Sequence, residues 1–546
     1  MAEERVLRRW HDAAQSAQYR RSGVWGDRTL PEIVDEHAVD APDKVAVVDD
    51  HVRWTYGELR DLSLRAAQLL LDLGVGAGDP VAVQVPSCGL LPLVHLAANR
   101  IGAFMVAMPT RWRRSEVGSL LRTIQAEVLV GVESERAIEV RPLHDELRPE
   151  LPRLRHVVYA RTASVDSFEE RVRACTPLSD EMQKRLRVGP DEPAHVMCSS
   201  GTTGVPKASV WSGNDMVALL AHQTGEALEL TADDVAVGIA PAGQGSTGYI
   251  FPILMPLLFG ATSVVLEHWT PEKALDLLVR ERCTFATAIP TQMVMLLDLP
   301  LESVDLSRFT RFNNAGAPLP PRVAEEIERR MGCTVQNVYG TTDGGVPTMT
   351  TLRDPDSARW TTVGRACVGE EVELRGPDGN ASPPGETGEV YWRGANNSYG
   401  YLNQPEYDDA NWVEDGWYRS GDLGHIDEDG YLRIVGRAKD MILRGGMNIF
   451  PFEVETVLIR HPRVAAVALV PVPDERLGER VCAVVVPAGE APELADLTRF
   501  LTQEGLAKFK FPERLVVVDE LPTNPGGKVD KLRLQSLVTA VSGKDT

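Results

Sequence analysis

Residues 197–210 have the sequence Met-Cys-Ser-Ser-Gly-Thr-Thr-Gly-Val-Pro-Lys-Ala-Ser-Val. Apolar residues stand on both sides of a run of hydroxyls and glycines, which predicts a loop between two strands. Several hydroxyl donors and one lysine in a short loop suit a polyphosphate, and an ordinary Ser/Thr/Gly surface turn is the alternative. The candidate phosphate-binding residues are Ser199, Ser200, Gly201, Thr202, Thr203, Gly204 and Lys207.

This loop differs from the Walker A motif. Gly204 and Lys207 are not adjacent, and Pro206 removes a backbone donor. The glycines let the backbone turn and approach a ligand closely. The loop on its own therefore leaves phosphate binding and a surface turn both open.

Composition limits the possible partners and compartment. The chain has 546 residues, roughly three to four domain-sized units, and is 43% hydrophobic. Its net charge of −21 argues against a nucleic-acid or anionic-membrane partner. Seven scattered cysteines without a CxxC pair argue against disulfides and zinc, and no secretory signal is visible. The most apolar run, 249–260, is too short to insert into a membrane, so we expect a cytoplasmic protein.

Strand-like and helix-like segments alternate along most of the chain, which predicts an α/β fold. We expect a large N-terminal domain over residues 1–438, made of mainly parallel sheets flanked by helices. Within it, residues 361–438 are rich in Gly, Pro and short alternating strands, which predicts a small β-rich subdomain. Residues 439–546 predict a small α+β C-terminal domain.

A second glycine-rich segment matches a dinucleotide-binding fingerprint. Residues 243–248, Gly-Gln-Gly-Ser-Thr-Gly, follow a predicted strand, and Glu267 lies about 20 residues further on. Pro252 and Pro256 argue against the helix that this fingerprint requires. An NAD-dependent oxidoreductase built on Gly243–Gly248 is therefore one alternative.

Four further motifs contain chemically useful side chains. Residues 337–343, Asn-Val-Tyr-Gly-Thr-Thr-Asp, bring a ring for a base, hydroxyls for phosphate and a carboxylate for Mg²⁺, or else form a strand end with a capping Asp. Residues 420–422, Ser-Gly-Asp, predict a Gly-flanked turn whose carboxylate suits ribose hydroxyls. Residues 436–440 are Gly-Arg-Ala-Lys-Asp, and residues 524–528, Asn-Pro-Gly-Gly-Lys, place a lysine in a loop near the C-terminus.

Together and in this order, these motifs resemble the adenylate-forming superfamily of acyl-CoA synthetases, peptide-synthetase adenylation domains and luciferases. Residues 54–59, Trp-Thr-Tyr-Gly-Glu-Leu, resemble its N-terminal motif, and the resemblance extends over about residues 30–534. It implies a two-domain fold with a mobile C-terminal domain, and ATP and Mg²⁺ as cofactors. The implied reaction joins a carboxylate to the α-phosphate of ATP with release of pyrophosphate, after which a thiol displaces AMP.

The resemblance also implies residue roles. Catalytic roles fall to Lys528, Thr342 and Asp343, and Asp343 is the metal ligand at a position where the family usually has Glu. ATP would be bound by the phosphate-loop residues and by Gly316, Ala317, Asn337, Tyr339, Gly340, Asp422 and Arg437. The acyl pocket would be formed by Gly243, Gln244, Gly245, Ser246, Asn314, Ala315 and Gly316. Lys439 and Asp440 would form the hinge, and Gly445 and Gly446 would line the path of the pantetheine.

The pocket segment narrows the substrate class. Amino-acid-activating members of the superfamily that this chain resembles have an Asp early in this segment, which pairs with the α-ammonium group. Residues 241–247 contain no acid, so the resemblance argues against a free α-amino acid. Residues 19–25 and 499–514 resemble stand-alone aryl-acid ligases of the 2,3-dihydroxybenzoate and salicylate type, which have His-Asn where this chain has Gln244-Gly245. We expect an aromatic or heteroaromatic acid, or another compact carboxylic acid without an α-ammonium group, transferred to the phosphopantetheine of a separate carrier protein. The alternatives are an acyl-CoA ligase for a small or aromatic acid, the oxidoreductase, and a non-catalytic binder of the same fold.

Overall fold

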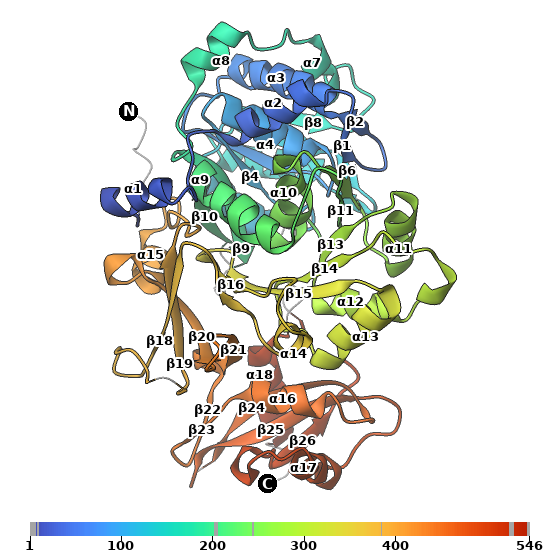
Figure 1. Ribbon diagram of the computed structural model, residues 1–546, viewed down its shortest axis with the longest axis vertical. Coiled ribbons are helices and arrows are strands. Elements are labelled where there is room, and N and C mark those ends of the chain that lie inside the picture. The colour runs from blue at the N-terminus through green and yellow to red at the C-terminus, as the bar shows by residue number, and fades with distance from the viewer. Residues whose placement is uncertain are drawn as a thin grey trace. The chain divides into compact units, whose positions relative to one another are not determined.

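The computed structural model describes residues 7, 10–200, 206–242, 245–383, 385–474, 476–523 and 529–542 (Figure 1). By its internal contacts the chain divides into two compact units. The first contains Met1–Val372 and Trp392–Arg419, and the second contains Glu373–Tyr391 and Ser420–Thr546.

A nine-stranded sheet lies at the centre of the first unit. In sheet order its strands are β17 (Arg365–Ala366), β16 (Gly345–Met349), β15 (Thr334–Thr341), β14 (Arg311–Asn314), β13 (Phe285–Ala288), β11 (Val235–Gly238), β12 (Thr262–Val265), β1 (Val45–Val48) and β2 (Arg53–Thr55). The pairs from β15 to β1 are parallel, and the outer pairs at both edges are antiparallel. The carboxyl ends of β11 to β15 therefore meet at one edge of the sheet.

A six-stranded sheet completes the first unit. In sheet order its strands are β10 (Pro206–Ser212), β9 (Pro193–Ser200), β4 (Phe104–Ala107), β3 (Pro80–Gln84), β5 (Val128–Val132) and β8 (His156–Ala160). Only β9 and β10 pair antiparallel. A short separate hairpin consists of β6 (Ser134–Glu135) and β7 (Ile138–Glu139). The predicted α/β fold with mainly parallel sheets is confirmed.

Helices make up much of the rest of the first unit. They are α1 (Ala13–Arg21), α2 (Leu30–Asp40), α3 (Tyr56–Asp72), α4 (Leu90–Arg100), α5 (Arg114–Ile124), α6 (Arg141–Leu147), α7 (Phe168–Ala174), α8 (Asp180–Leu186), α9 (Gly213–Val217), α10 (Met255–Leu258), α11 (Pro271–Arg280), α12 (Pro290–Leu297), α13 (Pro321–Met331), α14 (Asp356–Thr361) and α15 (Pro405–Asn411). The motif at 54–59 contains the end of β2 and the start of α3, where Thr55 and Glu58 form a reciprocal capping box.

Alternating strand residues divide the core of the first unit into layers. On the nine-stranded sheet, Val237 and Ala286 pack against α11, α12 and α13, whereas Ala236 and Phe285 face the opposite core. That second core is shared with α3, α4, α10 and the six-stranded sheet. The far face of the six-stranded sheet, including Ala82, packs on α5 and α6. The result is a helix–sheet–helix–sheet–helix arrangement.

Two π-helices lie in the central layer, η2 (Ala218–Gly225) and η3 (Ser246–Leu254). The prolines do not prevent a helix after the glycine-rich segment, but the helix is not a regular α-helix: η3 is a π-helix that runs through Pro252. Gly245 has φ 79°, and a Cβ on Gly248 would lie 2.1 Å from the carbonyl oxygen of Pro241. The glycines are therefore explained by close backbone packing at the start of a wide helix.

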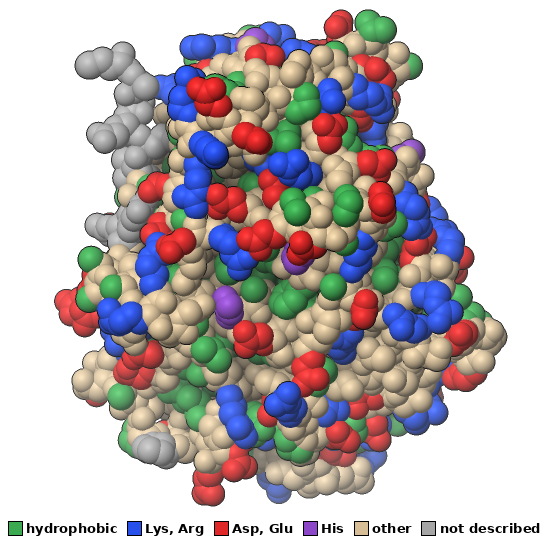
Figure 2. All heavy atoms as spheres, turned by 45° about the horizontal axis from the view of Figure 1, so that its top comes forward, with side chains coloured by type: hydrophobic (Ala, Val, Ile, Leu, Met, Phe, Trp, Pro, Cys, Tyr) green, Lys and Arg blue, Asp and Glu red, His purple; other side chains and the backbone are tan. Residues whose placement is uncertain are grey.

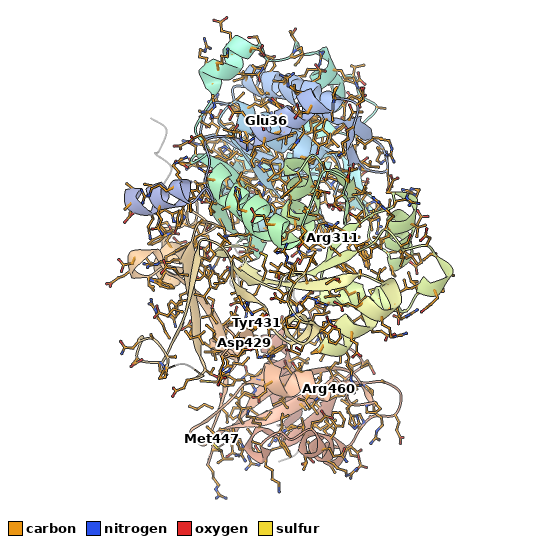
Figure 3. All side chains as sticks on the ribbon, in the orientation of Figure 1. Glu36, Arg311, Asp429, Tyr431, Met447 and Arg460 are labelled. Carbon is orange, nitrogen blue, oxygen red and sulfur yellow. The ribbon has the colours of Figure 1, made fainter. Side chains whose placement is uncertain are left out.

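Arg311, labelled in Figure 3, shows how the strand starts are tied together. It lies at the beginning of β14, and its Nη1 donates to the carbonyl oxygen of Leu228 at 2.8 Å. Its Nη2 pairs with Asp234, which comes directly before β11. The ion pair thus connects the amino ends of β11 and β14, and it leaves the carboxyl ends of these strands free of this contact.

The second unit is built on a five-stranded sheet. Its strands are β22 (Ile442–Arg444), β23 (Met447–Ile449), β24 (Val464–Asp474), β25 (Gly478–Pro487) and β26 (Arg514–Val517). One face packs on α16 (Pro451–Leu458) and α17 (Leu494–Gln503), and the other on α18 (Lys531–Ser542). Strands β18 (Glu370–Arg375), β19 (Gly388–Gly394), β20 (Tyr418–Ile426) and β21 (Leu432–Arg437) follow one another in a four-stranded sheet.

The surface offers no simple guide to a ligand. Figure 2 shows acidic and basic side chains interspersed over the face that it presents. In the part of the chain that the structure describes, we find no helix with the length and apolar character needed to cross a membrane. The binding of an anion must therefore be explained by individual side chains.

Candidate active site

Strands β9 and β10 flank the predicted phosphate loop. They pair antiparallel, with Ser199 opposite Lys207 and Ser200 opposite Pro206. The predicted strand–loop–strand order is thereby confirmed on both sides of the loop. The loop candidates Gly201, Thr202, Thr203 and Gly204 lie outside the described residues. Their role in phosphate binding stays a prediction.

The turn between β15 and β16 places a carboxylate beside these strands. Ser199 Oγ donates to Asp343 Oδ1 at 3.1 Å, and Lys207 Nζ lies 3.9 Å from Asp343 Oδ2. Both side chains of the pair are mostly buried, at 19% exposure for Lys207 and 13% for Asp343. A hydroxyl, an ammonium group and a carboxylate from distant parts of the sequence therefore meet here.

Side chains outside the turn hold its backbone in place. Trp211 Nε1 donates to the carbonyl oxygen of Thr342 at 3.3 Å. The Asp343 carbonyl accepts from Ser209 Oγ at 3.4 Å and also from Ser398 Oγ. Sequence reasoning missed Trp211, Ser209 and Ser398, although the alternation of Ser209 and Trp211 on one strand places both on the same face.

The predicted acyl-pocket segment approaches the same turn. A Cβ on Gly245 would lie 3.2 Å from Thr342 Oγ1, and one on Gly316 would lie 3.6 Å from Thr247 Oγ1. The structure therefore brings the start of η3, the end of β14 and the turn after β15 together. Gly243 and Gln244 lie outside the described residues, and the side chain of Ser246 is not described.

Asn314 and Asn337 are neighbours on β14 and β15. Asn314 Nδ2 donates to Asn337 Oδ1 at 2.9 Å and to the Ala317 carbonyl at 3.1 Å, while Asn337 Nδ2 donates to the Arg359 carbonyl at 2.6 Å. These donors are used within the protein, so the two amides shape the sheet edge. Tyr339 lies two residues further along β15, and its half-buried ring packs edge-on against Trp392, at 5.9 Å between centroids.

The other predicted residues of this edge differ in exposure. Ala315 is buried, and Gly316 and Ala317 are exposed. A Cβ on Gly340 would lie 2.2 Å from the Gly345 carbonyl oxygen, so no larger residue fits that position without a backbone shift. The end of β15 is thus closely packed at Gly340, whereas Gly316 and Ala317, which follow β14, are exposed to solvent.

One row of polar side chains crosses three central strands beneath the pocket segment. Thr287, Asn313 and Gln336 are register partners on β13, β14 and β15, and each is completely buried. Among the described residues, Thr287 Oγ1, both amide atoms of Asn313, and Gln336 Oε1 have no hydrogen-bond partner. These residues alternate with the apolar Ala286 and Phe312, which face α11 to α13, so the polar row faces the layer that contains η3.

Of this polar row, the sequence places only Asn313 in an expected pocket wall, together with residues 314–317, and assigns neither Thr287 nor Gln336 to the pocket. The available indication was a polar residue at the centre of each otherwise apolar strand. Register could not be obtained from the sequence, and only register shows that the three residues form a line.

Comparison with known proteins identifies the family. The model of the AMP-binding enzyme family matches residues 34–402, and that of the AMP-binding enzyme C-terminal domain matches residues 453–528. The chain belongs to the AMP-binding enzyme family. As the resemblance implied, it is an adenylate-forming ligase that activates an acid.

Individual relatives extend over nearly the whole of this AMP-binding enzyme. It is 35% identical to the medium-chain fatty-acid–CoA ligase of Escherichia coli, over 95% of this chain and 92% of that protein. It is 32% identical to the salicyl-AMP ligase/salicyl-S-ArCP synthetase of Mycobacterium tuberculosis, over 95% and 92% of the two chains. The crystal structure of ATP-bound MatB from Rhodopseudomonas palustris is similar at TM-score 0.83 and 26% identity, over 94% and 100%.

In the second unit of this AMP-binding enzyme, the two predicted ribose-binding residues face each other. Asp422 and Arg437 are cross-strand partners on β20 and β21, and Arg437 Nε lies 3.0 Å from Asp422 Oδ1. The prediction of a turn at 420–422 is wrong, because these residues lie inside β20. Gly421 adopts φ 73° and the register shifts between Leu423 and Gly424, so the glycines accommodate an irregular strand.

The predicted hinge and pantetheine residues also lie in the second unit. Lys439 and Asp440 belong to a short 3₁₀ helix, η6 (Ala438–Asp440), between β21 and β22. Gly445 and Gly446 form the turn of the β22–β23 hairpin with φ of 57° and 83°, next to Met447, which Figure 3 labels. Lys528 lies outside the described residues.

Proposed function

We propose that this AMP-binding enzyme activates an aromatic or heteroaromatic acid with a polar substituent and transfers it to the phosphopantetheine of a separate carrier protein. In the first step a carboxylate oxygen bonds to the α-phosphorus of ATP, and the bond to the pyrophosphate oxygen breaks. In the second step the thiol sulfur bonds to the acyl carbon, and AMP leaves. Both steps require positioning and charge neutralisation more than protein nucleophiles.

The buried polar row of Thr287, Asn313 and Gln336 is the observation that supports a polar acid. A fatty-acyl chain over this row would leave buried donors and acceptors unpaired, at a cost of about 1–3 kcal/mol for each. A ring hydroxyl or ring nitrogen could accept from Asn313 Nδ2 or donate to its Oδ1. A pocket with unpaired polar groups discriminates strongly against acids that lack the matching substituent.

The turn after β15 supports the ATP assignment. Lys207 and the hydroxyls of the phosphate loop would hold the β- and γ-phosphates, and Thr342 would contact the α-phosphate. Asp343 fits a Mg²⁺ ligand, because Mg²⁺ in nucleotide sites takes one or two carboxylates together with phosphate oxygens and water. When bound, Mg²⁺ would neutralise charge on the triphosphate.

The remaining nucleotide contacts follow the family resemblance. Tyr339 would stack on adenine, and Asp422 and Arg437 would hold the ribose. Lys528 would meet the charge that develops between the carboxylate and the α-phosphate. We further propose that the chain forms domains over 1–438 and 439–546. Between the two half-reactions, the C-terminal domain would rotate about a hinge at Asp440.

A carboxylate panel in ATP–pyrophosphate exchange tests this proposal. The panel compares salicylate with benzoate, which differ by one hydroxyl, and both with medium-chain fatty acids. We expect the hydroxyl-bearing aromatic acid to give the highest kcat/KM. A preference for the fatty acids would contradict the role of the polar row, although adenylate formation itself would stand.

A second candidate is an acyl-CoA ligase, which is favoured by the 35% identity to a fatty-acid–CoA ligase. Both candidates share the first half-reaction. Competition between CoA and a phosphopantetheinylated carrier protein for the preformed adenylate separates them. Rapid formation of the CoA thioester without any carrier protein would reverse the order of the two.

A further inference from the structure

The ammonium group of Lys207 lies beside two neighbouring aromatic rings. Its Nζ is 5.1 Å from the ring centroid of Tyr401 and 4.7 Å from that of Tyr407. The two rings meet at 5.7 Å with an interplanar angle of 66°. Both distances are within the range of cation–π attraction, so we call Tyr401 and Tyr407 the aromatic cradle.

The backbone around Lys207 is fixed in a way that directs its side chain to this cradle. The segment after β19 pairs with β10, and Leu402 N donates to the Ala208 carbonyl at 2.9 Å. The Gln404 side chain bonds on both sides of Lys207, as Nε2 donates to the Pro206 carbonyl at 3.0 Å and Oε1 accepts from Ala208 N at 2.9 Å. These bonds to the residues before and after Lys207 fix the position of its backbone along β10.

The two rings of the cradle are fixed by α15. Tyr401 N donates to Asp408 Oδ1 at 2.9 Å, which ties the ring-bearing segment to the helix that contains Tyr407. Tyr401 is 1% exposed, so its ring is enclosed by the fold. The aromatic cradle is thus held in place by the surrounding fold.

The ion pair alone leaves the lysine incompletely compensated. Lys207 is mostly buried, and its distance of 3.9 Å to Asp343 is long for a charge-assisted hydrogen bond. The ring faces add attraction without carrying a net charge of their own. They therefore stabilise the buried ammonium group and leave its full charge for an incoming anion.

We propose that Tyr407 is a positioning residue for ATP: its ring, together with that of Tyr401, holds Lys207 toward the triphosphate. This inference depends on the proposed role of the phosphate loop. It assigns to Tyr407 a function that depends on the ring and not on the hydroxyl. It also predicts that Tyr407 acts only through Lys207.

Calorimetric titration with MgATP in the absence of acid tests the proposal, with steady-state KM for ATP and for the acid as a second readout. Tyr407→Leu should weaken ATP binding about five- to thirtyfold, the range expected for loss of a partly buried cation–π contact. Tyr407→Phe keeps the ring and should stay within about twofold of the wild type. The KM for the acid should not change. Equal losses in the Phe and Leu variants, or none in Leu, would overturn the proposal.

A double-mutant cycle excludes a merely structural role. In a Lys207→Met background, Tyr407→Leu should have no further effect on ATP affinity, whereas a structural defect would add its full cost. Tyr159→Leu is the matched control, since it removes a ring 5.0 Å from Arg141 Cζ elsewhere in the first unit and should leave ATP binding unchanged. If no acid supports exchange but Tyr407→Leu still weakens ATP binding, the proposed function fails and the cradle stands.

Discussion

The phosphate side and the acyl side of this AMP-binding enzyme differ in how their polar groups are satisfied. On the phosphate side, Asp343 is bonded by Ser199, and Lys207 has Asp343 and two aromatic rings as partners. On the acyl side, Thr287 Oγ1 and both amide atoms of Asn313 are buried without partners in the described part of the chain.

The difference separates two tasks. A site whose charged groups already have partners is preorganised for a ligand that never varies, such as a triphosphate. A site with unpaired buried groups gains most from the ligand that completes them, and so sets substrate choice. We therefore expect changes on the phosphate side to alter ATP use with any acid, and changes on the acyl side to alter the ranking of acids.

The largest effect is expected from a residue that belongs to neither side. Lys528→Ala should lower the rate of adenylate formation about 10²- to 10³-fold, because the charge developing between carboxylate and phosphate loses its counter-charge. Thioester formation from preformed adenylate should largely survive. Single-turnover assays of the two half-reactions measure both effects, and equal losses in both would sink the proposed rotation about Asp440.

A somewhat smaller effect is expected at Asp343. Asp343→Asn keeps the size of the side chain but removes the charge that would hold Mg²⁺, and should lower kcat/KM for ATP about a hundredfold. The acid KM should be unchanged. Asp343→Glu restores the residue usual in the family and serves as the control, with activity well above that of the Asn variant. An effect of Asp343→Asn on the ranking of acids would break the division between the two sides.

On the acyl side, Asn313→Leu replaces an amide by an apolar group of similar size. It should lower kcat/KM for the preferred polar acid about five- to 150-fold, the equivalent of about 1–3 kcal/mol for an unpaired polar group. The value for the unsubstituted acid should rise or stay constant. Parallel exchange assays at saturating ATP measure the ratio, and an unchanged ratio would mean that the row does not contact the substrate.

Local sequence patterns predicted what depends on local chemistry. The strand–loop–strand around Ser199 and Lys207 follows from an apolar–polar–apolar run, and the strand that ends in Thr341 follows from the apolar residues before it. The mainly parallel α/β layering follows from alternating elements. In each case the pattern lies within about ten to fifteen neighbouring residues, the range over which periodicity is informative.

The features that were missed depend on register or on contacts between distant segments. Asn313 is a buried polar residue in any reading, but its alignment with Thr287 and Gln336 needs the strand register. The sequence alone shows Tyr407 only as a residue of a helix. Its contact with Lys207 depends on the pairing of β10 with the segment before α15. Asp422 was expected in a turn, because a strand that accommodates glycine at a positive φ cannot be distinguished from a turn by composition.

Glu370 is connected to the turn that contains Asp343 through hydrogen bonds of Asn396. Asn396 Oδ1 accepts from Val346 N at 2.8 Å, just past the Asp343 turn, and Asn396 N donates to Glu370 Oε1 at 3.0 Å. Gln223 Nε2 donates to the same carboxylate oxygen at 3.2 Å. Burial is the main cause that raises the pKa of Glu370, from 4.5 to about 8.

The smallest predicted effect is a pH dependence of stability due to Glu370. The pKa of Glu370 is about 8 in the folded protein and 4.5, its ordinary value, in the unfolded chain. Between pH 4.5 and 8 the folded protein therefore holds a proton on Glu370 that the unfolded chain has released. Its stabilising contribution is therefore complete below pH 4.5 and is lost as the pH rises through 8. Buried His11, with its pKa lowered by burial to about 4, acts only below its ordinary 6.5. Thermal melting from pH 6.5 upward should show a falling midpoint in the wild type and a flatter profile in Glu370→Gln; parallel profiles would mean that Glu370 stays ionised in the fold.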